Sequence, residues 1–299
     1  MTSRAMPSIL DCHVHLWDPR RLDYPWLEEA PELNRPFTAD DFAALRPEPV
    51  EVVFMEAGRK ERQAADEIEW VRGQAEHNTW IRGAVAHVPL ERPAEAAEAI
   101  RRFAADPFVV GVRRNLQDEA PGFIEDPQLR AGVRLLGEAG LPFDACVRRH
   151  QLDELAQLAV ACPDTTIVLN HLGKPKADTR SQWSQALRQV AKQPNTVCKL
   201  SGLATELPPD TPRAFALSLL REALDLFGPD RCLFGSDWPV MQLATDYRSW
   251  LDLVQEALAP TPWTVQDAVL RGNAERVYRL APSRFHPAEP AGPTQKEAP

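Results

Sequence analysis

Near its N-terminus the chain reads Asp11-Cys12-His13-Val14-His15, directly after an apolar pair. If this stretch is a β-strand, its period of two places Asp11, His13 and His15 on one face. The two imidazoles then converge on one point, and imidazole is the most common protein ligand for a divalent metal. The alternative is that the two histidines only satisfy each other near a strand end, because a short His-x-His match often arises by chance. Partners from distant parts of the chain must decide between these interpretations.

The composition is that of a soluble globular protein. Of the 299 residues, 44% are hydrophobic and 26% are charged, and no apolar run approaches the length of a membrane span. The first residues lack the hydrophobic stretch of a signal peptide, so we expect a cytoplasmic protein. The five cysteines have no Cys-x-x-Cys spacing and fit buried, reduced thiols. The net charge of -9 argues against a nucleic acid or an anionic membrane as partner.

Apolar runs typical of buried strands alternate with helical stretches along the chain. The predicted strands are residues 8–16, 51–58, 81–88, 108–115, 141–148, 165–172, 196–202 and 231–236. Helices are predicted after the later strands, at residues 60–77, 93–105, 126–139, 152–162, 180–193, 211–227 and 247–258. Strands and helices that alternate in this way, over a chain of this length, predict a single-domain (β/α)8 TIM barrel.

Two segments fall outside this alternation. Residues 18–49 contain many prolines, which are expected to break any regular element and to leave a loop that packs over something. Residues 282–299 are rich in proline, alanine and glutamate, and we expect this tail to be disordered. The barrel is therefore assigned to residues 1–281.

Polar residues end nearly every predicted strand, where a barrel of this kind carries its active site. They are His13 and His15, Glu56, His87, Arg113 and Arg114, Arg148 and His150, His171, Lys199 and Ser201, and Asp237. Strand alternation adds to this, because residues two apart in a strand share a face. Three of the polar residues therefore share a face with apolar residues two and four positions earlier. These sets are Val52, Phe54 and Glu56; Ile167, Leu169 and His171; and Leu233, Gly235 and Asp237. We expect all three polar residues to face the barrel axis.

Three motifs carry a resemblance to the amidohydrolase superfamily. They are residues 11–17 (Asp-Cys-His-Val-His-Leu-Trp), 171–175 (His-Leu-Gly-Lys-Pro) and 234–240 (Phe-Gly-Ser-Asp-Trp-Pro-Val). The chain is most similar to the amidohydrolase-related branch, amidohydrolase 2, which holds sugar and aromatic-acid lactonases. The likeness runs from about residue 10 to residue 280 and includes Gly-Asn-Ala at 272–274. It implies a barrel that hydrolyses a lactone.

The resemblance also implies a set of site residues, with His13, His15, His171 and Asp237 around the reacting carbonyl. The chain departs from the branch at Asn170, which stands where an aspartate is frequent. No carboxylatable lysine ends the strand at 108–115, which argues against the binuclear subtype. We therefore expect at most one divalent metal, zinc or manganese. Because some members of the branch work without metal, metal-independent action stays open.

The roles of these residues follow from their chemistry. Asp237 is the expected general base that takes a proton from the attacking water; its alternative is to fix the turn into the next residues. The three imidazoles either bind the metal with Asp237 or hydrogen-bond the water and the carbonyl oxygen. Glu56 is either a further metal ligand or a partner that orients one of the histidines.

Four residues are expected to contact the substrate. Arg113 is suited to hold a carboxylate or a ring hydroxyl of the substrate. Arg114 is the next residue of the strand and should point to the opposite face. For either arginine, the alternative is a salt bridge under the loops. His150 and Lys174 are candidate polar contacts, and Trp238 is a candidate apolar wall for a small ring. The alternatives are a structural role for His150 and ordinary loop packing for the other two.

The sequence therefore predicts a lactone hydrolase that acts on a small polar lactone, either from a sugar acid or with a carboxylate. One rival is a metal-dependent decarboxylase of the same superfamily. The other is a catalytically silent barrel that binds a ligand. The complete set of three histidines and Asp237 argues against this rival. Assembly into a homo-oligomer is left open.

Overall fold

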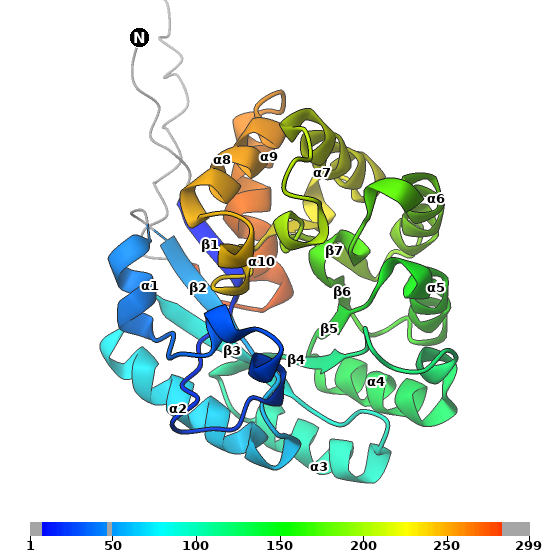
Figure 1. The fold of residues 1–299 in the computed structure, drawn as a ribbon. Helices are drawn as coiled ribbons and strands as arrows, with labels where there is room; N and C mark the ends of the chain where they lie inside the picture. The colour runs from blue at the N-terminus through cyan, green and yellow to red at the C-terminus, as the bar shows by residue number, and fades with distance from the viewer. Residues whose placement is uncertain (1–7, 47–49, 283–299) are drawn as a thin grey trace, which may run out of the picture.

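Eight parallel strands form one sheet in chain order, as the computed structural model shows for residues 8–46 and 50–282 (Figure 1). They are β1 (Ile9–Val14), β2 (Val50–Met55), β3 (Ile81–His87), β4 (Val109–Asn115), β5 (Phe143–Cys146), β6 (Ile167–Leu169), β7 (Thr196–Leu200) and β8 (Cys232–Phe234). The first strand meets the end of the last one through a parallel bridge between Val14 and Trp238. Here the Asp237 amide donates to the His13 carbonyl at 2.8 Å, and the His15 amide donates to the Trp238 carbonyl at 2.7 Å. The predicted barrel is confirmed, and it closes between two of the motifs.

The helices surround the strands, as the view in Figure 1 shows. After β2 the chain alternates strand and helix: α2 (Ala64–His77), α3 (Pro93–Ala104), α4 (Pro127–Ala139), α5 (Leu152–Ala161), α6 (Arg180–Ala191), α7 (Arg213–Phe227) and α8 (Tyr247–Leu258). Each buries an apolar stripe, such as Leu217, Leu220 and Phe227 of α7, because side chains three to four residues apart share one helix face. This stripe packs toward the outer face of the sheet.

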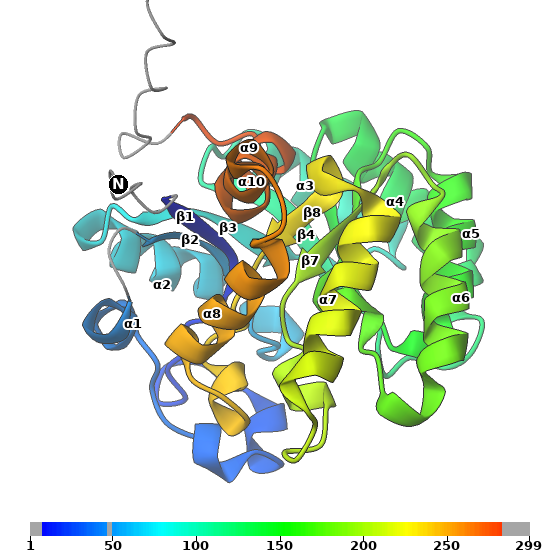
Figure 2. The same cartoon turned by 90° about the horizontal axis from the view of Figure 1, so that it is seen from above.

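The barrel interior is filled by a separate apolar cluster. Its members come from seven strands and from α10 (Asn273–Val277) with the adjoining Tyr278: Leu10, Cys12, Val53, Met55, Val85, Val110, Val168, Val197, Leu233, Ala274, Val277 and Tyr278. Figure 2 shows α9 (Trp263–Asp267) and α10 near the start of β1, while the loop that follows β1 lies at the opposite end. The last helices therefore cover the end of the barrel away from the site.

The predicted faces were wrong for β2 and β6. Val52 and Phe54, like Ile167 and Leu169, belong to the cluster between strands and helices, whereas Val53 and Val168 are interior. The prediction for β8 agrees with the structure, in which Leu233 is interior. Strands of a parallel barrel are apolar on both faces, so their hydrophobic pattern carries no sign of which face points inward.

The first strand also departs from simple alternation. Its register against β2 shifts between Asp11 and Val14, and Cys12 joins the interior cluster. Asp11 does not share the face of the histidines: its Oδ1 accepts from the amide of Ser236 at 2.9 Å, and burial raises its pKa to about 6. The irregularity turns His13 toward the barrel axis one residue after Cys12.

The proline-rich segment is more ordered than predicted. It contains α1 (Ala39–Leu45), which starts at a capping box in which Asp41 accepts from the Thr38 amide at 2.8 Å. Two short 3-10 helices, Pro25–Glu28 and Pro31–Leu33, each begin with proline, whose fixed φ suits a first helical position. Within the described residues, no helix is long and apolar enough to cross a membrane. Apart from its first residue, the tail predicted at 282–299 lies outside the described residues.

Candidate active site

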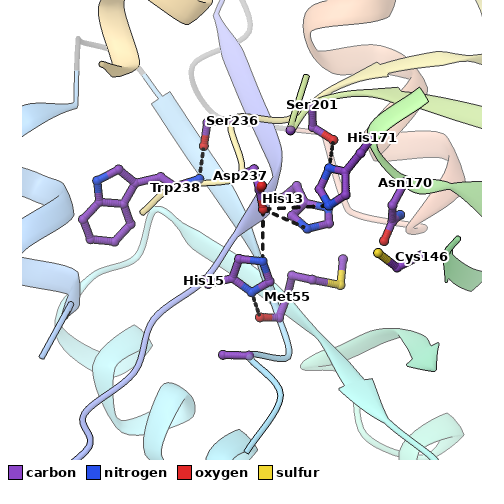
Figure 3. A network of polar contacts seen from close by, with 12 residues as sticks. His13, His15, Met55, Cys146, Asn170, His171, Ser201, Ser236, Asp237 and Trp238 are labelled. Carbon is purple, nitrogen blue, oxygen red and sulfur yellow. Dashed lines mark hydrogen bonds and ion pairs between the residues drawn. The ribbon is translucent and has the colours of Figure 1, made fainter. Parts of the chain in front are cut away.

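Three imidazoles face one carboxylate at the ends of β1, β6 and β8 (Figure 3). The Oδ1 atom of Asp237 lies 3.6 Å from Nε2 of His13, 3.3 Å from Nε2 of His15 and 3.9 Å from Nε2 of His171. All four side chains are buried. Asp237 is thus the common neighbour of the histidines that two separate motifs supply.

Unusual backbone conformations bring two of these residues into place. Asp237 has φ +68° and His171 has φ +55°, in the left-handed region that non-glycine residues rarely adopt. Leu169 faces the helices, and simple alternation would turn His171, two residues later, to the same side. The left-handed backbone at His171 directs the imidazole toward the barrel axis. Gly202, at φ +59°, leaves room for that ring: a Cβ atom there would lie 2.3 Å from Nδ1 of His171.

The second ring nitrogen of each histidine has a different neighbour. Nδ1 of His15 lies 2.9 Å from the Met55 carbonyl, so it must donate. Nδ1 of His171 lies 2.9 Å from the Ser201 hydroxyl, which either donates or accepts. Nδ1 of His13 lies 3.4 Å from the ammonium of Lys199. These contacts fix the ring planes of all three imidazoles.

Burial governs the charges of this cluster. It lowers the pKa of His171 to about 3 and that of His13 well below its ordinary value, so both rings are neutral near pH 7. Burial alone would raise the pKa of Asp237, but the imidazoles of His171 and His15 outweigh it and hold the pKa below its ordinary value. Asp237 is therefore ionised and able to accept a proton.

The donor set also suits a divalent cation. One ligand atom each from His13, His171 and Asp237 lie within 4.8 Å of one another. Nε2 of His13 is buried and has no hydrogen-bond partner among the described residues. Neutral imidazoles and a carboxylate are the ligands that zinc and manganese take.

A cavity of about 330 Å³ opens above the cluster. Residues from several strand ends and loops line it: His15, Trp26, Glu56, Ala57, Gly58, Arg113, Asn115, Gln117, Asp118, Cys146, His171, Lys174, Asp237 and Val240. Its volume suits a small ligand. His13 is not among the lining residues and lies beneath them.

The chain as a whole resembles a known family. Residues 10–280 match the family described as Amidohydrolase. The chain belongs to this family. The resemblance of the three motifs to the amidohydrolase superfamily, in the branch that holds lactonases, is thereby confirmed.

Close relatives of this amidohydrolase carry lactonase names. The L-fucono-1,5-lactonase of Burkholderia multivorans is 33% identical over 289 residues, which cover 91% of this chain and 96% of the relative. That of Burkholderia ambifaria is 30% identical over 288 residues and covers 91% and 95%. The solved structure of a Burkholderia multivorans amidohydrolase with bound zinc is similar at a TM-score of 0.82 and 30% identity, covering 91% of this chain and 99% of that one.

The two arginines of β4 in this amidohydrolase point apart. Arg113 lines the cavity, and its Nη1 donates to the Glu56 carbonyl at 3.0 Å and lies 3.6 Å from the Glu56 carboxylate. Arg114 is directed away from it, with Nη2 at 3.0 Å from Glu91 and 2.6 Å from Glu119. Neighbouring strand residues point to opposite faces, which is why only one of the two reaches the cavity.

Glu56 lines the cavity but is not in the group of candidate metal ligands. Its Oε2 lies 3.1 Å from Nη1 of Arg59 and accepts from the Gly58 amide at 3.0 Å. Burial alone would raise its pKa, but Arg113 and Arg59 lower it to about 2. A carboxylate already held by two guanidinium groups is a poor cation ligand, so the structure argues against Glu56 in the metal role.

Two of the predicted substrate contacts lie elsewhere. His150 is exposed on the 3-10 helix Arg149–Gln151 and does not line the cavity, because the chain turns outward after β5. Trp238 is only 1% exposed and points away from the histidines, packing edge-on against Phe37 and Phe42. Lys174 does line the cavity, with Nζ 3.2 Å from Glu206.

Several lining residues were missed from the sequence. Trp26 and Val240 supply the apolar wall that was assigned to Trp238, and Trp26 is held by its Nε1 donating to the Ala57 carbonyl at 2.8 Å. The signal was present in part, since the predicted packing loop contains Trp26. Cys146, which lies at the end of β5, and Gln117 carry no such signal, because a single thiol or amide side chain does not stand out from its neighbours in the sequence.

Proposed function

We propose that this protein hydrolyses a small polar lactone by attack of a water molecule on the ester carbonyl. The observation that carries the proposal is the ionised carboxylate of Asp237 in the cavity wall, with imidazole nitrogens at 3.3 to 3.9 Å. A carboxylate so placed accepts a proton from water that approaches a carbonyl in the cavity. The lactonase names of the two Burkholderia relatives support the substrate class.

In this mechanism the residues divide the work by position. Asp237 takes the proton of the attacking water and can return it to the ring oxygen as the lactone opens. His15 and His171 also line the cavity and face the same point, so they orient the water and the carbonyl oxygen. Trp26 and Val240 cover the apolar side of the ring and exclude other water.

We propose that one divalent metal ion, zinc or manganese, belongs to this site. Asp237 and two of the three imidazoles would hold it, and the zinc in the related amidohydrolase supports this. Such an ion supplies a lowered pKa of water and a polarised carbonyl. The described residues offer a single ligand group, and the guanidinium of Arg113, which lines the same cavity, would repel a second cation. Metal analysis of the purified protein should give at most one equivalent; two would contradict the proposal.

The charges around the cavity favour a neutral, polyhydroxylated lactone over a carboxylated one. Arg113 forms an ion pair with Glu56, and Lys174 forms one with Glu206, so the charge of each cation is already balanced by a carboxylate of the protein. Both still offer N–H donors to hydroxyl groups. A sugar-acid lactone matches such donors without adding an unpaired charge.

The test is a pH-indicator screen of aldonolactones and carboxylated lactones, with and without a chelator. We expect acid release from a neutral aldonolactone and at least tenfold lower kcat/KM for carboxylated rings. Release of carbon dioxide from an aromatic acid, without lactone opening, would instead identify the decarboxylase. Binding of lactones without any turnover would identify a silent binding barrel.

A further inference from the structure

A fully buried ion pair lies beneath His13, inside the barrel. Nζ of Lys199, on β7, is 2.6 Å from Oδ1 of Asp144, on β5, and both side chains are 0% exposed. Asp144 also accepts from the amide of Asn170 at 2.8 Å and from the hydroxyl of Tyr278 at 2.8 Å. A buried pair with this many hydrogen bonds is held in one arrangement. The ammonium of Lys199 therefore has a fixed position.

That position decides which nitrogen of His13 carries the proton. An ammonium group has three donors and no acceptor, so Nδ1 of His13, 3.4 Å from Nζ, can only accept from it. A neutral imidazole with an accepting Nδ1 has its proton on Nε2. His15 is the opposite case, because its Nδ1 must donate to the Met55 carbonyl, so the tautomer that leaves a lone pair on Nε2 is the one that this contact selects in a neutral ring.

We infer that Lys199 is a positioning residue that keeps the proton of His13 on Nε2, directed at Asp237, and thereby excludes His13 from metal binding, although its ring is close enough to His171 and Asp237 to share a metal ion with them. Nε2 of His13 lies 3.6 Å from Oδ1 of Asp237, its nearest carboxylate oxygen, and has no hydrogen-bond partner among the described residues. A metal-bound histidine needs a lone pair on the ligating nitrogen and normally donates its other N–H to an acceptor. Beside the ammonium of Lys199, Nε2 carries the proton and has no lone pair for a metal, and Nδ1 faces a donor and not an acceptor.

The positions of the three imidazole rings agree with a role for His13 that differs from that of His15 and His171. His13 is 0% exposed and does not line the cavity, whereas His15 and His171 do. His15 and His171 are thus the two imidazoles that reach a metal ion or the reacting water. His13 acts behind Asp237 and keeps its carboxylate aimed at the cavity. The inference rests on the proposed hydrolase function only for its kinetic consequence.

The test replaces the ion pair without changing the net charge. Lys199→Met alone would leave Asp144 as an unpaired buried charge, so the variant is Lys199→Met combined with Asp144→Asn. The matched control is Tyr278→Phe, which removes a hydrogen bond of Asp144 and leaves Lys199 beside His13. Thermal unfolding of both variants establishes that they are folded.

The tautomer and the zinc affinity are compared in chelator-treated protein, and kcat is compared in the proteins as purified. Long-range 1H–15N spectra of histidine-labelled protein, with His13 assigned by its absence in His13→Gln, should show the proton on Nε2 in the wild type and the control. The double variant should populate the Nδ1–H form and bind Zn²⁺ at least tenfold more tightly. Its kcat for the lactone should fall about tenfold or more, the scale of a misdirected general base, with KM little changed.

A wild-type His13 with its proton on Nδ1 would overturn the inference, as would an unchanged tautomer and zinc affinity in the double variant. The tautomer and the zinc affinity are measured without substrate, so they decide the question even if no lactone is turned over. Conversely, the wild type could hydrolyse a lactone rapidly while its His13 carries the proton on Nδ1. That result would support the proposed function and contradict the role given to Lys199.

Discussion

At the scale of single residues, Asp237 is the group on which the chemistry depends. We expect Asp237→Asn to remain folded and to lower lactone hydrolysis by on the order of 10² or more, because an amide cannot accept the proton of the attacking water. The measurement is kcat on the best lactone from the screen, with thermal unfolding as the control for folding. Turnover near the wild-type rate would remove Asp237 from the mechanism.

The two arginines of β4 provide a matched pair. Arg113 lines the cavity, and Arg114 is bound to Glu91 and Glu119 outside it. We expect Arg113→Met to lower kcat/KM about ten- to a hundredfold through loss of a charged hydrogen bond of roughly 1.5 to 3 kcal/mol. Arg114→Met should change stability and leave kcat/KM within about twofold.

The test of this pair is the ratio of the two losses on one lactone. Equal losses from both variants, or none from either, would show that β4 does not read the substrate. Because Arg113 also holds Glu56, the folding of its variant is checked by near-UV circular dichroism.

At the scale of elements, a buried glutamate joins α2 to the end of β2. Oε1 of Glu67 accepts from the Ala57 amide at 3.1 Å, and its Oε2 lies 3.7 Å from Nε of Arg59, which also binds Glu56. Burial raises the pKa of Glu67 to about 8, and the nearby Glu56 adds to the rise while Arg59 opposes it. The folded protein thus holds a proton on this carboxyl that the unfolded chain releases at lower pH.

The sign of the pH dependence follows from that difference. Above the ordinary glutamate pKa and up to the folded value, the folded state binds more protons, so this group makes the free energy of unfolding fall as pH rises. The slope is at most about 1.4 kcal/mol per pH unit for one proton. Glu67→Gln removes the dependence and keeps an oxygen for the Ala57 amide.

We expect the stability of Glu67→Gln relative to wild type to grow as the pH is raised from about 6 to about 8. Urea unfolding at several pH values measures it. The control is Glu69→Gln on the same helix, whose side chain is 70% exposed and should show no such trend. Parallel pH profiles for wild type and Glu67→Gln would contradict the expectation.

At the scale of the whole molecule, Arg271 ties the last helical segment to the start of the barrel. Its fully buried guanidinium donates to the Ile9 carbonyl at 3.0 Å and to Glu51 at 2.7 Å. We expect Arg271→Met to lower the free energy of unfolding by about 3 kcal/mol, the low end for a broken buried pair, because Arg82 stays beside Glu51.

Denaturant unfolding checks this value. The matched control is Arg213→Met, which breaks the exposed pair with Glu256 and should cost less than about 1 kcal/mol. Equal losses in the two variants would show that the contacts of Arg271 do not hold the barrel together.

The fold was predictable because its signals are local. Most strands and helices have enough apolar residues in their own sequence to mark them, and the eight strands and the helices α2 to α8 match the predicted ranges closely. No range was predicted for the helices Trp263–Asp267 and Asn273–Val277. The short helix Ala39–Leu45 was missed, since its capping box is hidden among prolines. The three histidines and Asp237 were also recognisable, because each lies in a compact motif at a strand end.

The sequence by itself thus determined the barrel, the family and the three histidines and one aspartate at the centre of the site. The tertiary structure alone decided which way each side chain points: that His171 reaches the axis through a left-handed backbone, and that Trp238 faces away from the cavity. It alone places Lys199 of β7 and Asp144 of β5 under His13 of β1. The reason is that strands buried on both faces carry no pattern for direction, and contacts between distant strands depend on register, which no single segment encodes.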